Sequence, residues 1–305
     1  MRMAQLLAVS IGLALAVAGC GGGGSAPSPP PPGEVTPLAF SSNRDGDWEI
    51  YRSKADGTGL VNVTNDPDND DGFPAWSPDQ TRIAYASDKD GDYEIYVVNV
   101  ATGAITQVTN TGSDWDDIEA CWSPDGTKIA YVQVIAWAPE MVLVMNADGS
   151  GTPVDLAGGI DPAWSPDGTK IAGTLVSQSP YDLEIYVMNA SGGERTNLTD
   201  SGGASFGPAW SPNGTEIAFF SRSPAGSNAI LKMSSAGGSI RWLADVGDVP
   251  DGFAAPCWSP DGSKIVFSPK VGDDYQIHIM NADGTGRAVL LADAGVDYLW
   301  PDWCR

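Results

Sequence analysis

Aspartates gather in several segments of the first half of the chain, and their spacing suits ligands for a hard cation. The two densest clusters lie around residues 66–71 and 114–117. Calcium takes about six to eight oxygen ligands, which carboxylates supply. We therefore predict a calcium site in these loops. The alternative is a solvated acidic surface that keeps the protein soluble. The predicted ligands are Asp68, Asp70, Asp71, Asp114, Asp116 and Asp117.

A second acidic motif, the run Asp88–Asp92, starts like an EF-hand loop with the letters D-K-D-G-D. Asn99 stands where the closing glutamate of such a loop belongs, so an EF-hand is rejected. The motif instead predicts a hairpin turn, in which Asp bonds the backbone and Gly adopts a positive φ.

Carboxylates on the strands predicted to be innermost offer a second chemistry. Glu119, Asp161 and Asp302 lie there, and a pair of carboxylates could serve a carbohydrate-active lyase or hydrolase. Other catalytic sets lack support, because His278 is the single histidine and no G-x-S-x-G motif occurs. We therefore expect a non-enzymatic protein and keep the lyase or hydrolase as the alternative.

Two tryptophans beside the acidic segments, Trp48 and Trp115, are candidates for anchoring a partner, since aromatic residues often dominate interface energy. With Glu119, Asp161 and Asp302 they form the predicted partner-binding set. The net charge of −23 argues against a nucleic-acid partner, which needs a basic surface, and favours a basic protein or peptide.

A sequence repeat indicates which structural elements position these residues. Tryptophan recurs at intervals of 42 to 48 residues, at Trp76, Trp122, Trp164, Trp210, Trp258 and Trp303. Each interval holds short alternating runs separated by turn residues, as in 82–86, 94–99 and 105–109. Four antiparallel strands per unit predict an all-β propeller blade, and no segment shows a helical apolar period.

The chain ends predict how the propeller closes. The first unit begins at Leu38 without a tryptophan strand before it, and the last element, 299–303, is a tryptophan strand without a unit after it. Pairing of these N- and C-terminal strands would complete a sixth blade and remove an exposed edge. The sequence therefore predicts a closed, six-bladed β-propeller.

Two motifs carry a resemblance to a known family. Residues 162–168 read P-A-W-S-P-D-G, and residues 88–96 read D-K-D-G-D-Y-E-I-Y. They resemble the PD40, or WD40-like, repeats of the TolB propeller family, from about Leu38 to the C-terminus. The resemblance implies a propeller that acts as a protein- or peptide-binding scaffold. The α/β domain that accompanies the propeller in TolB has no counterpart in residues 1–36, so its roles are not carried over.

Residues 1–19 predict a lipoprotein signal peptide, because Arg2 precedes an apolar run that ends in V-A-G before Cys20. Cys20 is the predicted lipidation site, and residues 20–36 form a Gly/Ser/Pro-rich tether to a propeller spanning 37–305. We expect a monomer in the bacterial envelope, on the periplasmic side of the outer membrane or the cell surface, touching membrane through its lipid only. A Cys257–Cys304 disulfide is left open.

Overall fold

The computed structural model describes residues 37–136, 138–176, 183–200, 202–223, 226–247 and 255–303. Every regular element in these ranges is a β-strand, which confirms the all-β prediction. No helix in the described part is long and apolar enough to cross a bilayer. The predicted signal peptide, Cys20, the tether and Cys304 lie outside the described residues.

Most strands form antiparallel sheets of four, taken in chain order from the inside outward. One sheet comprises β4 (Asp71–Trp76), β5 (Arg82–Ser87), β6 (Glu94–Asn99) and β7 (Ile105–Gln107). The next comprises β8 (Trp115–Trp122), β9 (Lys128–Ile135), β10 (Met141–Asn146) and β11 (Val154–Gly158).

A larger sheet consists of two sets of four strands, joined only by a parallel pairing of Leu183 with Ala204. The first set is β12 (Ile160–Trp164), β13 (Lys170–Val176), β14 (Leu183–Asn189) and β15 (Thr196–Asn197). The second set is β16 (Ala204–Trp210), β17 (Glu216–Arg222), β18 (Asn228–Ser234) and β19 (Arg241–Asp245).

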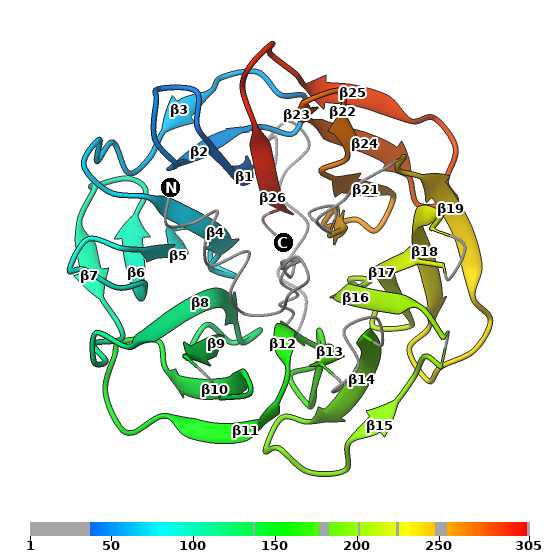
Figure 1. The fold of residues 1–305 in the computed structure, drawn as a ribbon, viewed down its shortest axis with the longest axis horizontal. Coiled ribbons are helices and arrows are strands. Elements are labelled where there is room, and N and C mark those ends of the chain that lie inside the picture. Colours follow the sequence, from blue (N-terminus) through cyan, green and yellow to red (C-terminus); the bar gives the residue numbers. More distant parts are fainter. Residues whose placement is uncertain are drawn as a thin grey trace.

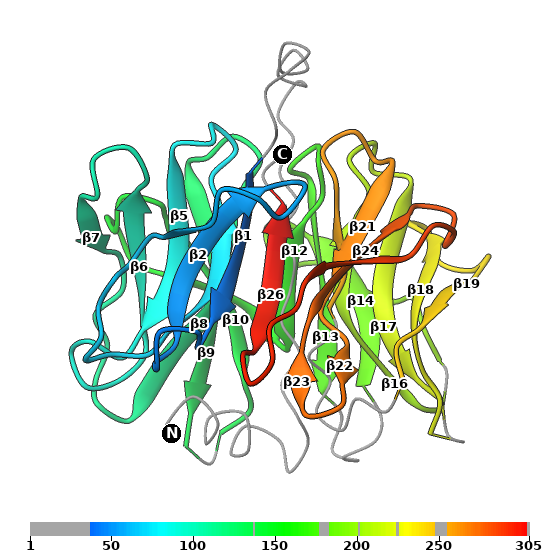
Figure 2. The same ribbon diagram turned by 90° about the horizontal axis from the view of Figure 1, so that it is seen from above.

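A further sheet contains β20 (Cys257–Trp258), β21 (Lys264–Phe267), β24 (Ile277–Asn281) and β25 (Ala288–Leu291). A hairpin of β22 (Lys270–Val271) and β23 (Asp274–Tyr275) connects β21 to β24 and projects at the lower end in Figure 2.

The two ends of the described chain share one sheet. β1 (Pro37–Ser42) pairs with β2 (Glu49–Lys54) on one side and with β26 (Tyr298–Trp303) on the other, and β3 (Val61–Asn62) completes the set. Leu38 faces Trp303 across this pairing. Figure 1 shows the sheets placed around a common centre, with β4, β8, β12, β16 and β26 nearest to it.

The repeated motifs explain this geometry locally. In each Ser-Pro-Asp-type turn the Asp or Asn side chain accepts a backbone hydrogen bond two residues later, as Asp125 does from Thr127 at 3.0 Å. The six repeat tryptophans are all buried, and the indole N–H of Trp122 donates to the Ala75 carbonyl of the preceding sheet at 3.1 Å. Trp210 and Trp258 make the same bond. Three of the repeat tryptophans thus bond one sheet to the next, whereas Trp76 and Trp164 are buried without such a bond among the described residues.

Candidate functional site

Asp70 and Asp116, two of the predicted metal ligands, tie each sheet to the one before it. Asp70 accepts a hydrogen bond from the backbone N–H of Trp48 at 3.3 Å, and Asp116 from that of Tyr93 at 2.9 Å. Asp297 accepts the same kind of bond from Tyr275 at 2.8 Å. A carboxylate engaged in this way satisfies a backbone donor at the sheet boundary.

Asp71 and Asp117 lie in strands, whereas the sequence analysis placed them in loops. The ladders of β4 and β8 extend to pair Asp71 with Ser87 and Asp117 with Gln133, whose side-chain amide donates to Asp117 at 3.0 Å. Both carboxyl groups are buried, and burial raises the pKa of Asp71 to about 7 and that of Asp117 to about 8. Each of these two carboxyl groups therefore keeps its proton to a higher pH than an exposed aspartate does.

The remaining two predicted ligands, Asp68 and Asp114, are exposed. Among the residues that the structure describes, no three His, Cys, Asp or Glu side chains form a group that could hold a metal ion. Two of the six aspartates thus accept backbone hydrogen bonds, two are buried and two face the solvent. This arrangement does not fit a single preformed calcium site.

The two candidate anchors have different surroundings. Trp48 is half-buried and its ring lies 5.9 Å from that of Trp300, which stacks on Phe73 at 4.1 Å. Trp115, at the start of β8, is 39% exposed. Trp48 therefore belongs to an aromatic group that packs against the core, and Trp115 is the anchor that solvent reaches.

Glu119 and Asp161 form a buried acidic pair between β8 and β12. Asp161 donates its backbone N–H to Glu119 Oε2 at 2.8 Å, and Asp161 Oδ2 accepts from Thr174 Oγ1 at 2.6 Å and from the Gly207 N–H at 3.0 Å. Both carboxylic acids are fully buried, which raises the pKa of each. Each carboxyl group accepts a hydrogen bond from the backbone of the next sheet, so both groups have a structural role.

The backbone at these two positions is unusual. Phe73, Glu119, Asp161, Gly207 and Trp300 all have φ between 54° and 61°, in the left-handed region that L side chains rarely adopt. Each lies three residues before a repeat tryptophan, at a point where the strand register shifts. At Glu119 and Asp161 the bulge directs the carboxyl group toward the backbone of the next sheet, which the strict alternation of a strand does not predict.

Asp302 and His278 complete the predicted candidates. Asp302 is buried and accepts the backbone N–H of Trp76 at 2.7 Å, across the boundary between β26 and β4. His278 packs beside Phe267, as expected, and burial together with Arg287 lowers its pKa to about 4. A neutral, packed histidine is a poor general base at this position.

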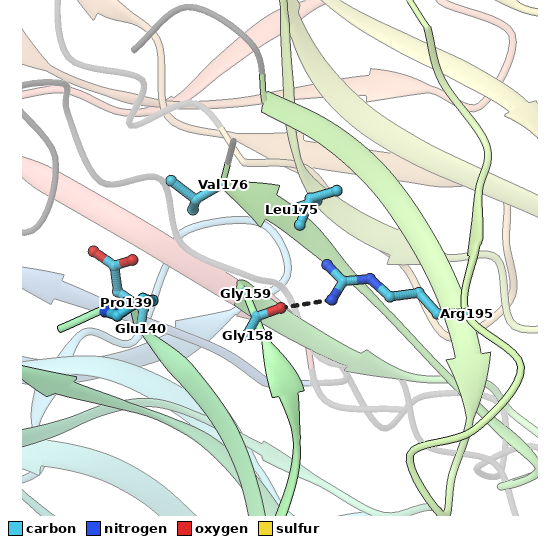
Figure 3. A pocket seen from close by; sticks show the side chains of 7 residues that line it. All are labelled: Pro139, Glu140, Gly158, Gly159, Leu175, Val176 and Arg195. Atoms are coloured by element: carbon cyan, nitrogen blue, oxygen red, sulfur yellow. Dashed lines mark hydrogen bonds between the residues drawn. The ribbon is translucent and has the colours of Figure 1, made fainter. Parts of the chain in front are cut away.

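A pocket between β8–β11 and β12–β15 was not predicted. Its volume is ≈ 260 Å³, and it is lined by Glu140, Gly158, Gly159, Leu175, Val176 and Arg195 (Figure 3). Arg195 donates from Nη1 to the Gly158 carbonyl at 2.8 Å and lies over the ring of Tyr186. A signal existed in the sequence, because Gly173 stands where the other units place Phe or Tyr.

Comparisons with solved structures agree with the fold. TolB from Acinetobacter baumannii is 21% identical with a TM-score of 0.77, and the match covers 88% of this chain but 66% of that one. A putative TolB from Agrobacterium tumefaciens is 20% identical with a TM-score of 0.65, covering 90% and 100%. An oligogalacturonate lyase from Vibrio parahaemolyticus is 14% identical with a TM-score of 0.59, covering 85% and 75%.

Comparison with curated protein sequences gives no match. The family model of the TolB beta propeller domain, PD40, matches residues 6–152 and 117–249, most of the chain. Taken with the four-stranded sheets and the repeat tryptophans at their boundaries, this match shows that the chain belongs to the TolB β-propeller family.

Proposed function

We propose that this chain is a six-bladed propeller, closed by the pairing of β1 with β26, that acts as a non-enzymatic scaffold for a protein or peptide. The terminal pairing and the four-stranded sheets around one centre support this architecture (Figure 1). The predicted signal peptide and Cys20 support a lipid anchor in the bacterial envelope, on the periplasmic side of the outer membrane or the cell surface. The proposed form is a monomer.

The binding surface in this proposal lies around Trp115. We call it the acidic surface and define it by Trp115, Asp68, Asp90 and Asp114. All four are exposed. Backbone-to-carboxylate bonds link the loops that carry them, from Trp48 to Asp70 and from Asp70 to Asp88, then from Tyr93 to Asp116. The loops are therefore held in fixed positions, which lowers the entropic cost of binding.

The observation that carries the proposal is an exposed indole among carboxylates. Trp115 is 39% exposed, and Lys89, the nearby cation, is already paired with Asp66 at 2.5 Å. An indole contributes a large apolar area, while the aspartates favour lysine and arginine on a partner. A basic protein or peptide with an apolar contact site matches this chemistry.

A pull-down from envelope extract at low salt tests the proposal. We expect the full chain to retain a partner that elutes as salt rises, because the surface attraction is screened. Trp115→Ala should abolish retention. Trp242→Ala, at a 53% exposed tryptophan on β19, is the matched control and should retain the partner. Equal retention by both variants would contradict the assignment of the surface.

The carbohydrate-active alternative has less support in this geometry. Glu119, Asp161 and Asp302 are buried and bonded to the backbone of a neighbouring sheet, so they are not presented to a substrate. The likeness to the lyase, at 14% identity, concerns the fold alone.

Calcium assistance stays a prediction of the sequence. A melting curve with added calcium, compared with magnesium, tests it, because a bound ion stabilises the folded state according to its occupancy. A calcium-specific rise that is lost in Asp68→Asn would support it, and a flat response would contradict it.

A further inference from the structure

The pocket beside Arg195 has features of a ligand site distinct from the acidic surface. Leu175 and Val176 supply an apolar wall from β13, and Gly158 and Gly159 line the pocket without side chains of their own. Figure 3 shows Glu140 and Arg195 on opposite sides of Gly158. An apolar hollow with a few placed polar groups is the usual form of a small-molecule site.

The guanidinium of Arg195 is held in one orientation. Its Cζ lies 3.8 Å from the centre of the Tyr186 ring, a cation–π contact, and Nη1 donates to the Gly158 carbonyl at 2.8 Å. Nε and Nη2 are buried and have no hydrogen-bond partner among the residues that the structure describes. These two nitrogens share the edge of the guanidinium that binds a carboxylate through two parallel hydrogen bonds.

Leaving such an edge unpaired costs stability, because buried donors on a charged group lose their hydration. The Tyr186 hydroxyl next to it is also buried without a partner. Tyr93 and Tyr131 also have buried hydroxyls without a partner among the described residues, so the orphaned guanidinium edge of Arg195, rather than the Tyr186 hydroxyl, distinguishes this place. A ligand carboxylate that reached this edge would satisfy both of its open donors.

Glycines create the space for this arrangement. The other units place aromatic rings at the position of Gly173, as in the pairs Phe40–Tyr51 and Tyr85–Tyr96. A Cβ on Gly173 would lie 2.5 Å from the Tyr186 hydroxyl, and one on Gly159 would lie 3.0 Å from it. Only glycine at both positions lets the Tyr186 ring lie under Arg195.

The charge pattern changes at the same place. Gly158 and Gly159 stand where the two preceding sheets have the aspartate pairs 70–71 and 116–117. This boundary therefore has no aspartate pair, which in the two preceding sheets supplies two carboxylates that could pair with an arginine or repel an anion. Two carboxyl groups remain nearby: Glu140 lines the pocket, and Asp161 lies close enough to Tyr186 to act on the pKa of its hydroxyl. Burial raises the pKa of both acids, and the ion pairs found among the described residues include none between Glu140 and Arg195.

We propose that this pocket binds a small ligand by its carboxylate, with two hydrogen bonds from Arg195 and a short aliphatic tail against Leu175 and Val176. The carboxylate belongs either to a free branched acid or to the C-terminus of a peptide. The inference goes beyond the proposed scaffold function, and its test uses residues outside the acidic surface.

Titration of the full chain, followed by calorimetry, tests the proposal with three probes. Isovalerate represents the free acid, N-acetylleucine represents a peptide C-terminus, and N-acetylleucinamide has the same tail without the carboxylate. We expect one of the two acids to bind and the amide to bind at least about tenfold more weakly, since charge-assisted bonds are lost. The tighter acid identifies the source of the carboxylate.

Arg195→Gln should lower the affinity of the preferred acid about ten- to a hundredfold. Arg195→Lys keeps the charge but loses the paired donors, and it should also bind more weakly; it serves if the Gln variant does not fold. Arg241→Gln, at an exposed arginine on β19, is the control and should bind as the unmodified chain does. No binding of either acid at millimolar concentration, equal binding of acid and amide, or unchanged affinity in both Arg195 variants would overturn the proposal.

Discussion

The sheets β4–β7 and β12–β15 share one repeat but differ at their boundary with the preceding sheet. In β4–β7, Asp70 and Asp71 lie at this boundary and Tyr85 packs against Tyr96 within 5.9 Å. In β12–β15 the equivalent positions hold Gly158, Gly159 and Gly173, and the ring of Tyr186 fills the space that a residue-173 side chain would need.

The difference shows how one scaffold produces two kinds of surface. Where the aspartates are present, they bond the neighbouring backbone and close the boundary. Where glycines replace them, a pocket of ≈ 260 Å³ remains and Arg195 borders it. Repeated packing positions carry the fold, and departures from the repeat carry the candidates for ligand recognition.

The largest expected effect concerns pH and comes from Asp71 and Asp117, the buried aspartates at the position that Gly159 occupies before β12. Folding raises the pKa of Asp71 to about 7 and that of Asp117 to about 8, mainly by burial. The folded state therefore binds more protons than the unfolded state between about pH 4 and pH 8. The stability that these acids contribute is fully present below pH 4 and is lost as pH rises through 7 to 8. We expect the melting temperature to fall by about 5 °C or more from pH 5 to pH 8.

Repulsion among the many surface carboxylates would act in the same direction, so matched variants are needed. Asp117→Asn should flatten the pH dependence because it removes a buried titrating group. Asp114→Asn removes the same formal charge from an exposed position and should leave the slope nearly unchanged. Identical slopes in both variants would show that burial of Asp117 is not the cause.

Filling the space at Gly173 should have the next largest effect. A Cβ there meets the Tyr186 hydroxyl at 2.5 Å, so Gly173→Ala must displace the ring and should cost about 1–3 kcal/mol in unfolding free energy. Gly193→Ala, where a Cβ meets nothing within 4 Å, should change stability by less than about 0.5 kcal/mol. Denaturant unfolding measures both. Adding Tyr186→Phe should relieve part of the Gly173→Ala cost, and no relief would mean that the clash lies elsewhere.

The contrast also shows what a sequence can predict here. Strands such as β5 and β6 follow from alternating apolar residues and turn motifs, and the structure confirms them. The different surroundings of neighbouring residues such as Asp70 and Asp71 cannot be predicted from these patterns. They depend on where the ladder begins and on a bulge three residues before each tryptophan, both set by packing between sheets. Gly173 is visible in the sequence as a departure from the repeat, but its consequence depends on Tyr186 in β14 and on Arg195 just before β15.

A smaller effect is expected at the boundary bond of Asp116. Asp116→Ala leaves the Tyr93 N–H without its acceptor, which should cost about 1–2 kcal/mol. Asp114→Ala, two residues earlier and exposed, should fall within about 0.5 kcal/mol of the unmodified chain. Denaturant unfolding at pH 7 compares the two, and equal losses would remove the distinction between boundary and surface aspartates.

Hydrogen–deuterium exchange of the full chain, with and without the partner retained at low salt, tests the central claim most directly. If the acidic surface is the binding surface, protection should increase at residues 66–70, 88–92 and 110–116, with no change in the Ser-Pro-Asp-Gly turns at the opposite end. Protection confined to those turns, or to the outer strands β19 and β25, would contradict it.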